Sequence, residues 1–195
     1  MTANLRCNWC GTDPLYVAYH DQEWGRPERD GRALWEALVL EGFQAGLSWI
    51  TILRRREGFR AAFQGFDPAR IATWGEAQIA ELVADPSIIR HRGKIEATIS
   101  GARAFLEIEA REGFSSFLWG HVGGRPLQNA RATPGTIPAE TPESQALAKA
   151  LKREGFKFCG PTITYAFMQA NGMVNDHLTT CPAHAVALSM DRPAR

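Results

Sequence analysis

Two pairs of cysteine and histidine lie at opposite ends of this chain of 195 residues. The segment VNDHLTTC carries His177 and Cys181, four positions apart. The N-terminal segment carries Cys7 and His20, separated by twelve residues. Zinc prefers four nitrogen or sulfur ligands in a tetrahedron, and structural zinc sites are closed by four protein ligands. One pair from each end would form a Cys2His2 site that holds the two ends of the chain together.

The spacing alone leaves other interpretations of these residues open. Cys10 forms a C-x2-C pair with Cys7 and could supply the sulfur in its place. His91, His121 and His184 are further histidines, but none has a ligand partner nearby in the sequence. Buried thiols and unrelated surface histidines would also explain the pattern. The residues therefore predict a metal site without fixing which cysteine belongs to it.

A carboxylate also falls on the apolar face of a predicted helix. The segment 33–42 is apolar almost all round, and Glu41 lies on the stripe of Leu34 and Leu38. A buried carboxylate is unfavourable without a cation or a hydrogen-bond donor, and the dipole disfavours negative charge near a helix C-terminus. A ligand could supply the partner of Glu41, but so could a salt bridge to an arginine such as Arg54 or Arg56, and the helix end could instead face solvent.

Aromatic side chains gather near this carboxylate in an otherwise polar part of the sequence. Such residues usually belong to a core, but in polar company they can also stack on a flat ligand. Most of them lie in the first 29 residues, which show no helical periodicity. The aromatic candidates for ligand binding are Trp9, Tyr16, Tyr19, Trp24 and Trp49.

The elements that must position these residues are helical. The stretch 123–140 is rich in glycine and proline and is expected to be a long loop, and the tail after Cys181, residues 182–195, is expected to be flexible. Residues 1–181 therefore form a single all-α domain in this interpretation. Apolar periodicity, capping residues and glycine stops predict helices over 30–46, 48–63, 67–74, 76–85, 94–110, 141–155 and 160–172.

The composition is that of a soluble globular protein, with 45% hydrophobic and 22% charged residues. The formal net charge of +1 excludes an overall basic field, so any contact with nucleic acid must come from local patches. Of three basic clusters, 149–157 leads into a glycine turn and a new helix, an arrangement that binds phosphate.

The sequence also predicts where the chain works. The N-terminus has no apolar core of a signal peptide, and no apolar run is long enough to span a membrane, so a cytoplasmic protein without a membrane partner is expected. Four cysteines in that compartment are more typical of thiols or metal ligands than of disulfides. A monomer is expected because no apolar surface beyond the core is evident.

Four blocks of the sequence resemble the 3-methyladenine DNA glycosylase I family of the helix-hairpin-helix glycosylases. The resemblance runs in order from about Cys7 to Cys181. It implies an all-α helix-hairpin-helix glycosylase fold and hydrolytic excision of 3-methyladenine from alkylated double-stranded DNA, the start of base excision repair. It also implies one structural Zn2+ per chain, which joins the N- and C-terminal segments. The blocks are DPLYVAYHDQEWG (13–25), EGFQAGLSWITIL (41–53), IIRHRGKIEA (88–97) and GFKFCGPTITYAFMQANGMVNDH (155–177).

The resemblance assigns roles to individual residues. Glu41 matches the catalytic-site carboxylate that recognises the base. The zinc ligands become Cys7, His20, His177 and Cys181, which leaves Cys10 out. The base-binding residues become Tyr16, Tyr19 and Trp49, with Trp9 and Trp24 nearby. The DNA-binding residues become Gly46 and Leu47, which insert into the duplex, and Lys157, Gly160 and Thr162 of a hairpin that spans 156–162.

One departure from the wider superfamily bears on mechanism. The superfamily hairpin L-P-G-V-G has two glycines where FKFCG has one, and the approximate place of the superfamily's catalytic aspartate is held by Asn175, with Asp176 one position away. Because 3-methyladenine in DNA is positively charged and leaves readily, less catalytic assistance is needed.

Two alternatives to a glycosylase follow from the same residues. A non-catalytic, zinc-stapled helix-hairpin-helix DNA-binding module would need neither the buried Glu41 nor the aromatic residues. A zinc hydrolase would leave one metal position open and often carries H-E-x-x-H, which this sequence lacks. The sequence therefore favours the glycosylase.

Overall fold

The computed structural model describes residues 6–190, which are predominantly helical. The all-α prediction is confirmed. A parallel pair of two-residue strands, β1 (Leu127–Gln128) and β2 (Val174–Asn175), joins the long loop to the segment after the last core helix. The helices are α1 (Pro14–Gln22), α2 (Gly31–Gln44), α3 (Trp49–Leu53), α4 (Arg56–Ala62), α5 (Pro68–Ile71), α6 (Glu76–Ala84), α7 (Arg92–Arg111), α8 (Phe114–Gly120), α9 (Pro142–Arg153), α10 (Pro161–Ala170) and α11 (Pro182–Ser189). Short 3-10 turns occur at η1 (Asn8–Cys10), η2 (Gln64–Phe66) and η3 (Pro134–Thr136).

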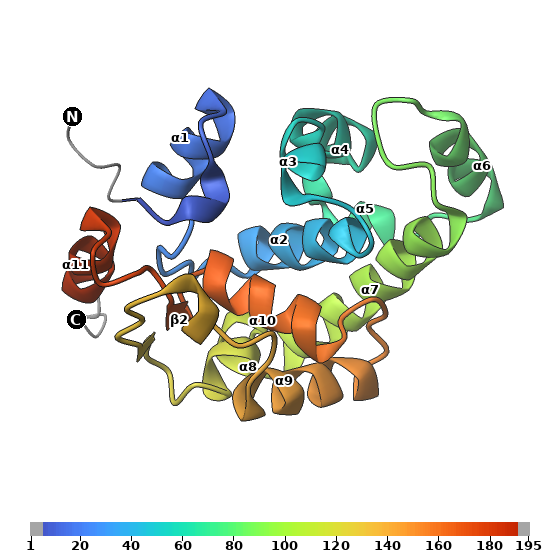
Figure 1. Ribbon diagram of the computed structural model, residues 1–195. Helices are drawn as coiled ribbons and strands as arrows, with labels where there is room; N and C mark the ends of the chain where they lie inside the picture. The colour runs from blue at the N-terminus through green and yellow to red at the C-terminus, as the bar shows by residue number, and fades with distance from the viewer. Residues whose placement is uncertain (1–5, 191–195) are drawn as a thin grey trace.

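Helix α2 lies at the centre of the molecule, with α3 to α6 on one side and α8 to α10 on the other (Figure 1). Its side chains Leu34, Trp35 and Phe43 are fully or almost fully buried in one continuous core. The long helix α7 crosses behind it and contributes Ile95 and Ile99 to the same core. The apolar periodicity therefore indicates the buried face of both helices, except that Leu106, on the predicted stripe of α7, is 36% exposed.

Local sequence signals account for several helix starts. The Asp30 carboxylate accepts a hydrogen bond from the Ala33 amide at 2.8 Å, and Asp13 caps α1 in the same way. The prediction of a single helix over 48–63 is wrong, because the backbone turns at Arg55 (φ −103°, ψ 1°) and separates α3 from α4. The helix predicted over 67–74 ends at Ile71, and α8 was not predicted. Ser48, the residue before α3, makes no side-chain cap for that helix, since its hydroxyl bonds the Thr51 hydroxyl at 2.8 Å.

Within residues 6–190, two helices near the ends of the chain, α1 and α11, were not predicted from the sequence. The first 29 residues contain α1, although its pattern of apolar residues is weak. The tail expected to be flexible instead contains α11, and residues 191–195 lie outside the described part of the chain. Two contacts fix this helix: Asn175 Nδ2 donates to the His184 carbonyl, and the His184 ring bonds the Asn129 carbonyl at 2.9 Å. These partners come from distant segments, so sequence periodicity does not reveal them.

The terminal helices α1 and α11 lie on the same side of the molecule (Figure 1). Between residues 6 and 190, none of the helices combines the length and apolar character required to cross a lipid bilayer.

Candidate active site and metal centre

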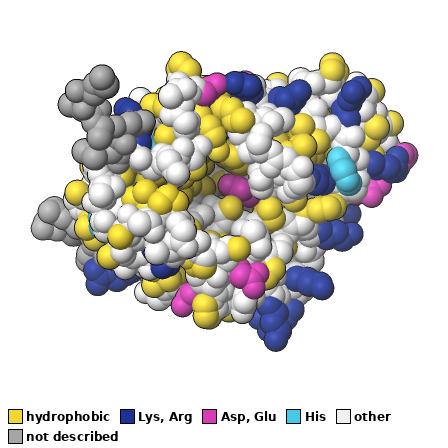
Figure 2. Space-filling model, viewed as in Figure 1, with side chains coloured by type: hydrophobic (Ala, Val, Ile, Leu, Met, Phe, Trp, Pro, Cys, Tyr) yellow, Lys and Arg dark blue, Asp and Glu magenta, His cyan; other side chains and the backbone are white. Residues whose placement is uncertain are grey.

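A recess opens between α1, the end of α2, α3 and α10. Its cavity volume is about 270 Å3, close to the lower end of the range for small-molecule sites. Figure 2 shows this face as a hollow bordered by hydrophobic side chains with acidic atoms at its centre. We call it the aromatic pocket. It is lined by Trp9, Tyr16, Tyr19, Trp24, Glu41, Gln44, Trp49, Ile137, Ala166 and Gln169.

The five aromatic residues selected from the sequence all line this pocket. Trp9 packs edge-on against Tyr16 at 5.0 Å and against Trp24 at 5.1 Å between ring centroids. Tyr19 packs against Trp49 at 5.5 Å. The indole N–H groups of Trp9 and Trp49 are buried and have no hydrogen-bond partner in the described part of the chain. Because buried donors are normally paired, these two enclosed N–H groups are exceptions in the wall of the pocket.

Glu41 lies at the floor of the pocket and is only 4% exposed. Burial raises the pKa of its carboxyl group to about 8, and no hydrogen bond or charge from the described residues opposes that shift. The salt bridge considered from the sequence is absent, because Arg54 pairs with Asp13 at 2.6 Å and Arg56 pairs with Glu23. A buried acid without a partner is suited to receive a donor or a cation from a ligand.

Sequence reasoning missed four residues of the pocket: Gln44, Ile137, Ala166 and Gln169. Ile137 comes from the long loop, whose position no local pattern predicts. Ala166 and Gln169 share one face of α10. The sequence signal for a site on that face is Gln169 itself, a glutamine among mostly apolar residues near the end of the helix.

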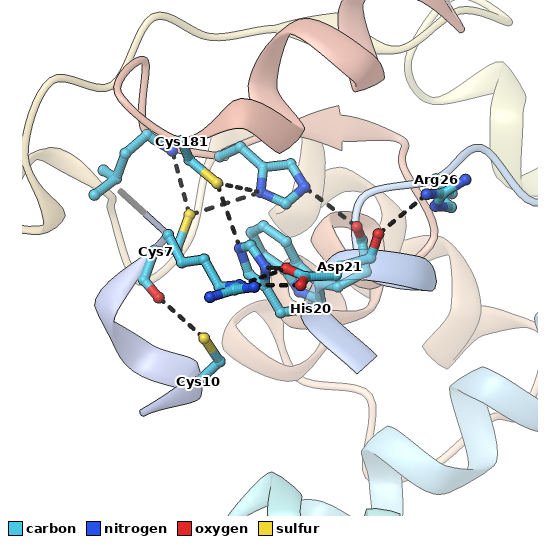
Figure 3. A network of polar contacts seen from close by, with 10 residues as sticks. Cys7, Cys10, His20, Asp21, Arg26 and Cys181 are labelled. Carbon is cyan, nitrogen blue, oxygen red and sulfur yellow. Dashed lines mark hydrogen bonds and ion pairs between the residues drawn. The ribbon is translucent and has the colours of Figure 1, made fainter. Parts of the chain in front are cut away.

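Cys7, His20, His177 and Cys181 form a buried cluster whose ligand atoms all lie within 4.8 Å of one another. Cys7 Sγ lies 3.6 Å from His177 Nδ1, and Cys181 Sγ lies 3.6 Å from His20 Nε2 and 3.9 Å from His177 Nδ1 (Figure 3). Zn–S and Zn–N bonds of about 2.3 and 2.0–2.1 Å place neighbouring tetrahedral ligands roughly 3.4–3.8 Å apart. Three of the ligand pairs therefore match the spacing around a tetrahedral metal ion, and the remaining pairs, which lie within 4.8 Å, would have to close around it.

The outer contacts of both histidines leave the correct nitrogen for such an ion. His20 Nδ1 bonds the Asp21 carboxylate at 2.8 Å, and Asp21 is in turn held by Arg6 (Figure 3). His177 Nε2 bonds the Trp24 carbonyl at 3.2 Å. Because metal-binding histidines commonly donate their other N–H to a carboxylate or a carbonyl, both contacts favour a metal site.

The surroundings of the two thiols also show that Cys7, and not Cys10, belongs to the cluster. Burial raises the pKa of the Cys7 thiol to about 12 and lowers the pKa of His177 to about 4, so a bound cation would be needed to hold the thiolate. The Cys10 thiol instead donates to the Cys7 carbonyl at 3.2 Å and is not part of the cluster.

A glycine is required at position 25 beside the cluster. Gly25 has φ +78°, and a Cβ on this residue would lie 2.7 Å from His177 Nε2.

The cluster and the aromatic pocket share a wall. The Trp24 ring lies 4.6 Å from the His177 ring, and the Trp9 ring lies 5.3 Å from the His20 ring, between centroids. Trp9 and Trp24 also line the pocket. The positions of the Trp9 and Trp24 side chains in the pocket therefore depend on the histidines of the cluster being held in place.

Comparison with known proteins agrees with this geometry. A family model described as methyladenine glycosylase matches residues 9–184. The chain belongs to the methyladenine glycosylase family. It is 53% identical to DNA-3-methyladenine glycosylase 1 of Escherichia coli (strain K12), over 90% of this chain and 95% of that one. A crystal structure of 3-methyladenine DNA glycosylase I superimposes with a TM-score of 0.90 at 56% identity and covers 92% of this chain and 99% of its own. A variant of 3-methyladenine DNA glycosylase I solved in complex with 3-methyladenine gives 0.88 at 37% identity, with 91% and 98% covered.

In this methyladenine glycosylase, the turn after α2 exposes Leu47. Gly46 has φ +85°, and the turn is closed by the Gln44 side-chain amide, which donates to the Leu47 carbonyl at 2.6 Å. The buried Lys94 holds the end of α2 by donating to the Phe43 and Ala45 carbonyls at 3.0 and 2.7 Å. Leu47 is 39% exposed on a turn that is braced from both sides.

The predicted hairpin lies between α9 and α10. Lys157, Gly160 and Thr162 are exposed, while Cys159 is buried and its carbonyl accepts the Thr164 hydroxyl at 3.0 Å. The missing glycine of the superfamily pattern is replaced by Phe158, which adopts the left-handed φ of +55° that glycine would favour.

Neither residue near the place of the superfamily's catalytic aspartate lines the aromatic pocket. Asn175 is buried and donates to Gln128 and to the His184 carbonyl. Asp176 is 1% exposed and accepts four side-chain hydrogen bonds. This glycosylase therefore has Glu41 as the carboxylate of its pocket.

Proposed function

We propose that this chain excises 3-methyladenine from alkylated double-stranded DNA by hydrolysing its N-glycosidic bond, and so starts base excision repair. The observation that carries the proposal is Glu41, a buried carboxyl group without a partner at the floor of an aromatic pocket of ligand size. A non-catalytic DNA-binding module would have no use for such a group. The relatives named 3-methyladenine glycosylases, one of them in complex with 3-methyladenine, support the same substrate.

The enzyme must first take the base out of the stack, because a base inside the duplex cannot enter the pocket. Leu47, exposed on its braced turn, would fill the space that the base leaves. Lys157 and the backbone N–H groups of Gly160 and Thr162, at the start of α10, would hold phosphate oxygens.

The bond to be broken needs little assistance. 3-Methyladenine carries a positive charge while it is attached to the sugar. Water adds to C1′ of the sugar, the bond from C1′ to N9 breaks, and its electron pair neutralises the departing base. The proton of the water goes to solvent. This chemistry agrees with the absence of a second acid among the residues that line the pocket.

The pocket selects the damaged base by its charge. Without a ligand, a carboxyl group with a pKa of about 8 is mostly protonated at neutral pH. A cation in the pocket lowers that pKa again, so Glu41 binds the charged base as a carboxylate and accepts a hydrogen bond from its exocyclic amine. The aromatic faces add a cation–π attraction of roughly 0.5–2 kcal/mol. Neutral adenine gains neither the attraction to an ionised Glu41 nor the cation–π attraction.

We assign a structural Zn2+ to Cys7, His20, His177 and Cys181. Four protein ligands leave no open position, so the ion takes no part in bond cleavage. Its role is to join the terminal segments and to support Trp9 and Trp24 at the pocket.

The chain is proposed to act as a monomer. Among the described residues, the exposed large hydrophobic side chains are Leu15, Leu47, Leu106, Phe158, Val186 and Leu188, and only the last two share an element, α11. Because its substrate is DNA, we place it in the compartment that holds the genome, which in bacteria is the cytoplasm.

The test is release of free bases from methylated duplex DNA by folded, zinc-loaded protein, with 3-methyladenine and 7-methylguanine separated by chromatography. We expect release of 3-methyladenine with little 7-methylguanine. Glu41→Gln should reduce 3-methyladenine release far more than it reduces binding to undamaged duplex. Release of neither base would leave the DNA-binding module as the better explanation, and equal losses in both assays would reject the role of Glu41.

A further inference from the structure

The aromatic pocket holds a second polar side chain whose orientation is fixed. Gln169 lies on α10 one turn after Ala166, and both line the pocket together with Glu41. The Gln169 amide nitrogen, Nε2, donates to Asp176 Oδ2 at 2.8 Å. This contact decides which end of the amide is left for the pocket.

Asp176 cannot rotate away from that contact. Besides Gln169, its carboxylate accepts hydrogen bonds from Asn129 Nδ2 at 2.8 Å, Arg131 Nε at 3.2 Å and the Tyr165 hydroxyl at 2.5 Å. A carboxylate only accepts hydrogen bonds, so the amide of Gln169 must present its nitrogen to Asp176. The amide oxygen, Oε1, then lies on the other side. It has no partner among the residues that the structure describes, and it is not among their enclosed, unsatisfied atoms.

We propose that Gln169 is a specificity-determining residue that reads the 6-amino group of the base. An amino group on a purine has two N–H donors. On the proposed function, the Glu41 carboxylate accepts one of them, and Gln169 Oε1 accepts the other. A base derived from guanine or hypoxanthine carries an oxygen at position 6, and Gln169 Oε1 cannot bond that oxygen because both atoms are acceptors. Gln169 therefore favours 6-amino purines over 6-oxo purines.

Asp176 acts in this scheme as a positioning residue. It touches no ligand, but it prevents the Gln169 amide from turning its N–H2 group into the pocket. In that orientation the N–H2 group would donate a hydrogen bond to the oxygen of a 6-oxo base. The loop residues Asn129 and Arg131 belong to the same network, so the long loop that carries Ile137 helps to fix the amide.

The experiment compares two free bases that differ at position 6, 3-methyladenine and 3-methylhypoxanthine. Their binding to zinc-loaded protein is measured by quenching of tryptophan fluorescence, since three tryptophans line the pocket. The variant is Gln169→Met, which keeps the side-chain length and removes the acceptor. The matched control is Gln145→Met on α9, where the amide also donates to a carboxylate, that of Glu140, at 2.7 Å and away from the pocket.

We expect Gln169→Met to weaken binding of 3-methyladenine about three- to tenfold, the loss typical of one neutral hydrogen bond. Binding of 3-methylhypoxanthine should stay the same or improve, and Gln145→Met should change neither. A loss of less than twofold for 3-methyladenine, or equal losses for both bases, would overturn the assignment and leave Gln169 a structural residue. If the unaltered chain fails to bind 3-methyladenine, the proposed function itself is wrong.

Discussion

Replacing Glu41 by glutamine should stabilise the unliganded protein, and the gain should grow with pH. The carboxyl pKa is raised from 4.5 to about 8 by burial in the folded chain, so the folded state resists ionisation that the unfolded state undergoes freely. The stabilising contribution of the protonated group is complete below pH 4.5 and is lost as the pH rises to about 8. Glu41→Gln removes this loss because an amide does not ionise.

The size of the effect follows from the two pKa values. The cost of burying Glu41 is roughly 2 kcal/mol at pH 6, roughly 3 kcal/mol at pH 7 and roughly 5 kcal/mol at pH 9. The absolute gain of the variant also depends on how well the glutamine amide packs. The increase of roughly 3 kcal/mol between pH 6 and pH 9 does not, since the amide carries no titratable proton.

Urea unfolding of the zinc-loaded protein and of Glu41→Gln, followed between pH 6 and pH 9, measures this difference. The matched control is Glu57→Gln, because the Glu57 side chain is 80% exposed and stays in water when the chain folds. For this control, the free energy of unfolding relative to the unaltered chain should be independent of pH. A constant difference for Glu41→Gln would show that Glu41 ionises normally in the folded state, and the proposed recognition of a cation would lose its physical basis.

Four further outcomes are expected. Cys181→Ser should lower the zinc content below one ion per chain and reduce thermal stability, and one full equivalent of retained zinc would contradict the ligand assignment. Removing the metal with a chelator should leave base release intact until unfolding begins, whereas loss of activity from a fully folded protein would indicate a catalytic ion. Leu47→Ala should slow release of 3-methyladenine from duplex DNA but leave binding of the free base unchanged, and a matching loss in free-base binding would argue against insertion into the duplex. Asp176→Asn should destabilise the fold by about 3–5 kcal/mol in urea unfolding, because it removes the negative charge opposite Arg131 and replaces one of the two acceptor oxygens by an N–H2 group that faces donors, and a loss below about 1 kcal/mol would mean that the network is not needed.

The helices could be predicted where one face is buried against a single core. Helix α2 shows this: its apolar stripe and the Asp30 cap are both local in sequence, and the structure contains both. The stripe also singled out Glu41, because a charged residue conflicts with an apolar periodicity in any fold that buries the helix.

The ends of the chain show the opposite case. The helices α1 and α11 have weak amphipathic patterns, so local periodicity could not indicate α1 or exclude a flexible tail after Cys181. They are fixed by distant partners, such as the Asn129 carbonyl that meets the His184 ring.

The sequence by itself determined the chemistry that this protein can carry: four candidate metal ligands of the right types, one acid out of place, and aromatic rings around it. Residue type and local spacing are enough for that, since they do not depend on how the chain is folded. Only the tertiary structure decided which of these groups meet. In the structure, Cys10 lies outside the cluster and Glu41 has no salt bridge. Asp176 lies outside the pocket and accepts a hydrogen bond from the Gln169 amide. Such contacts join residues up to 170 positions apart, and only packing of the whole chain sets their distances.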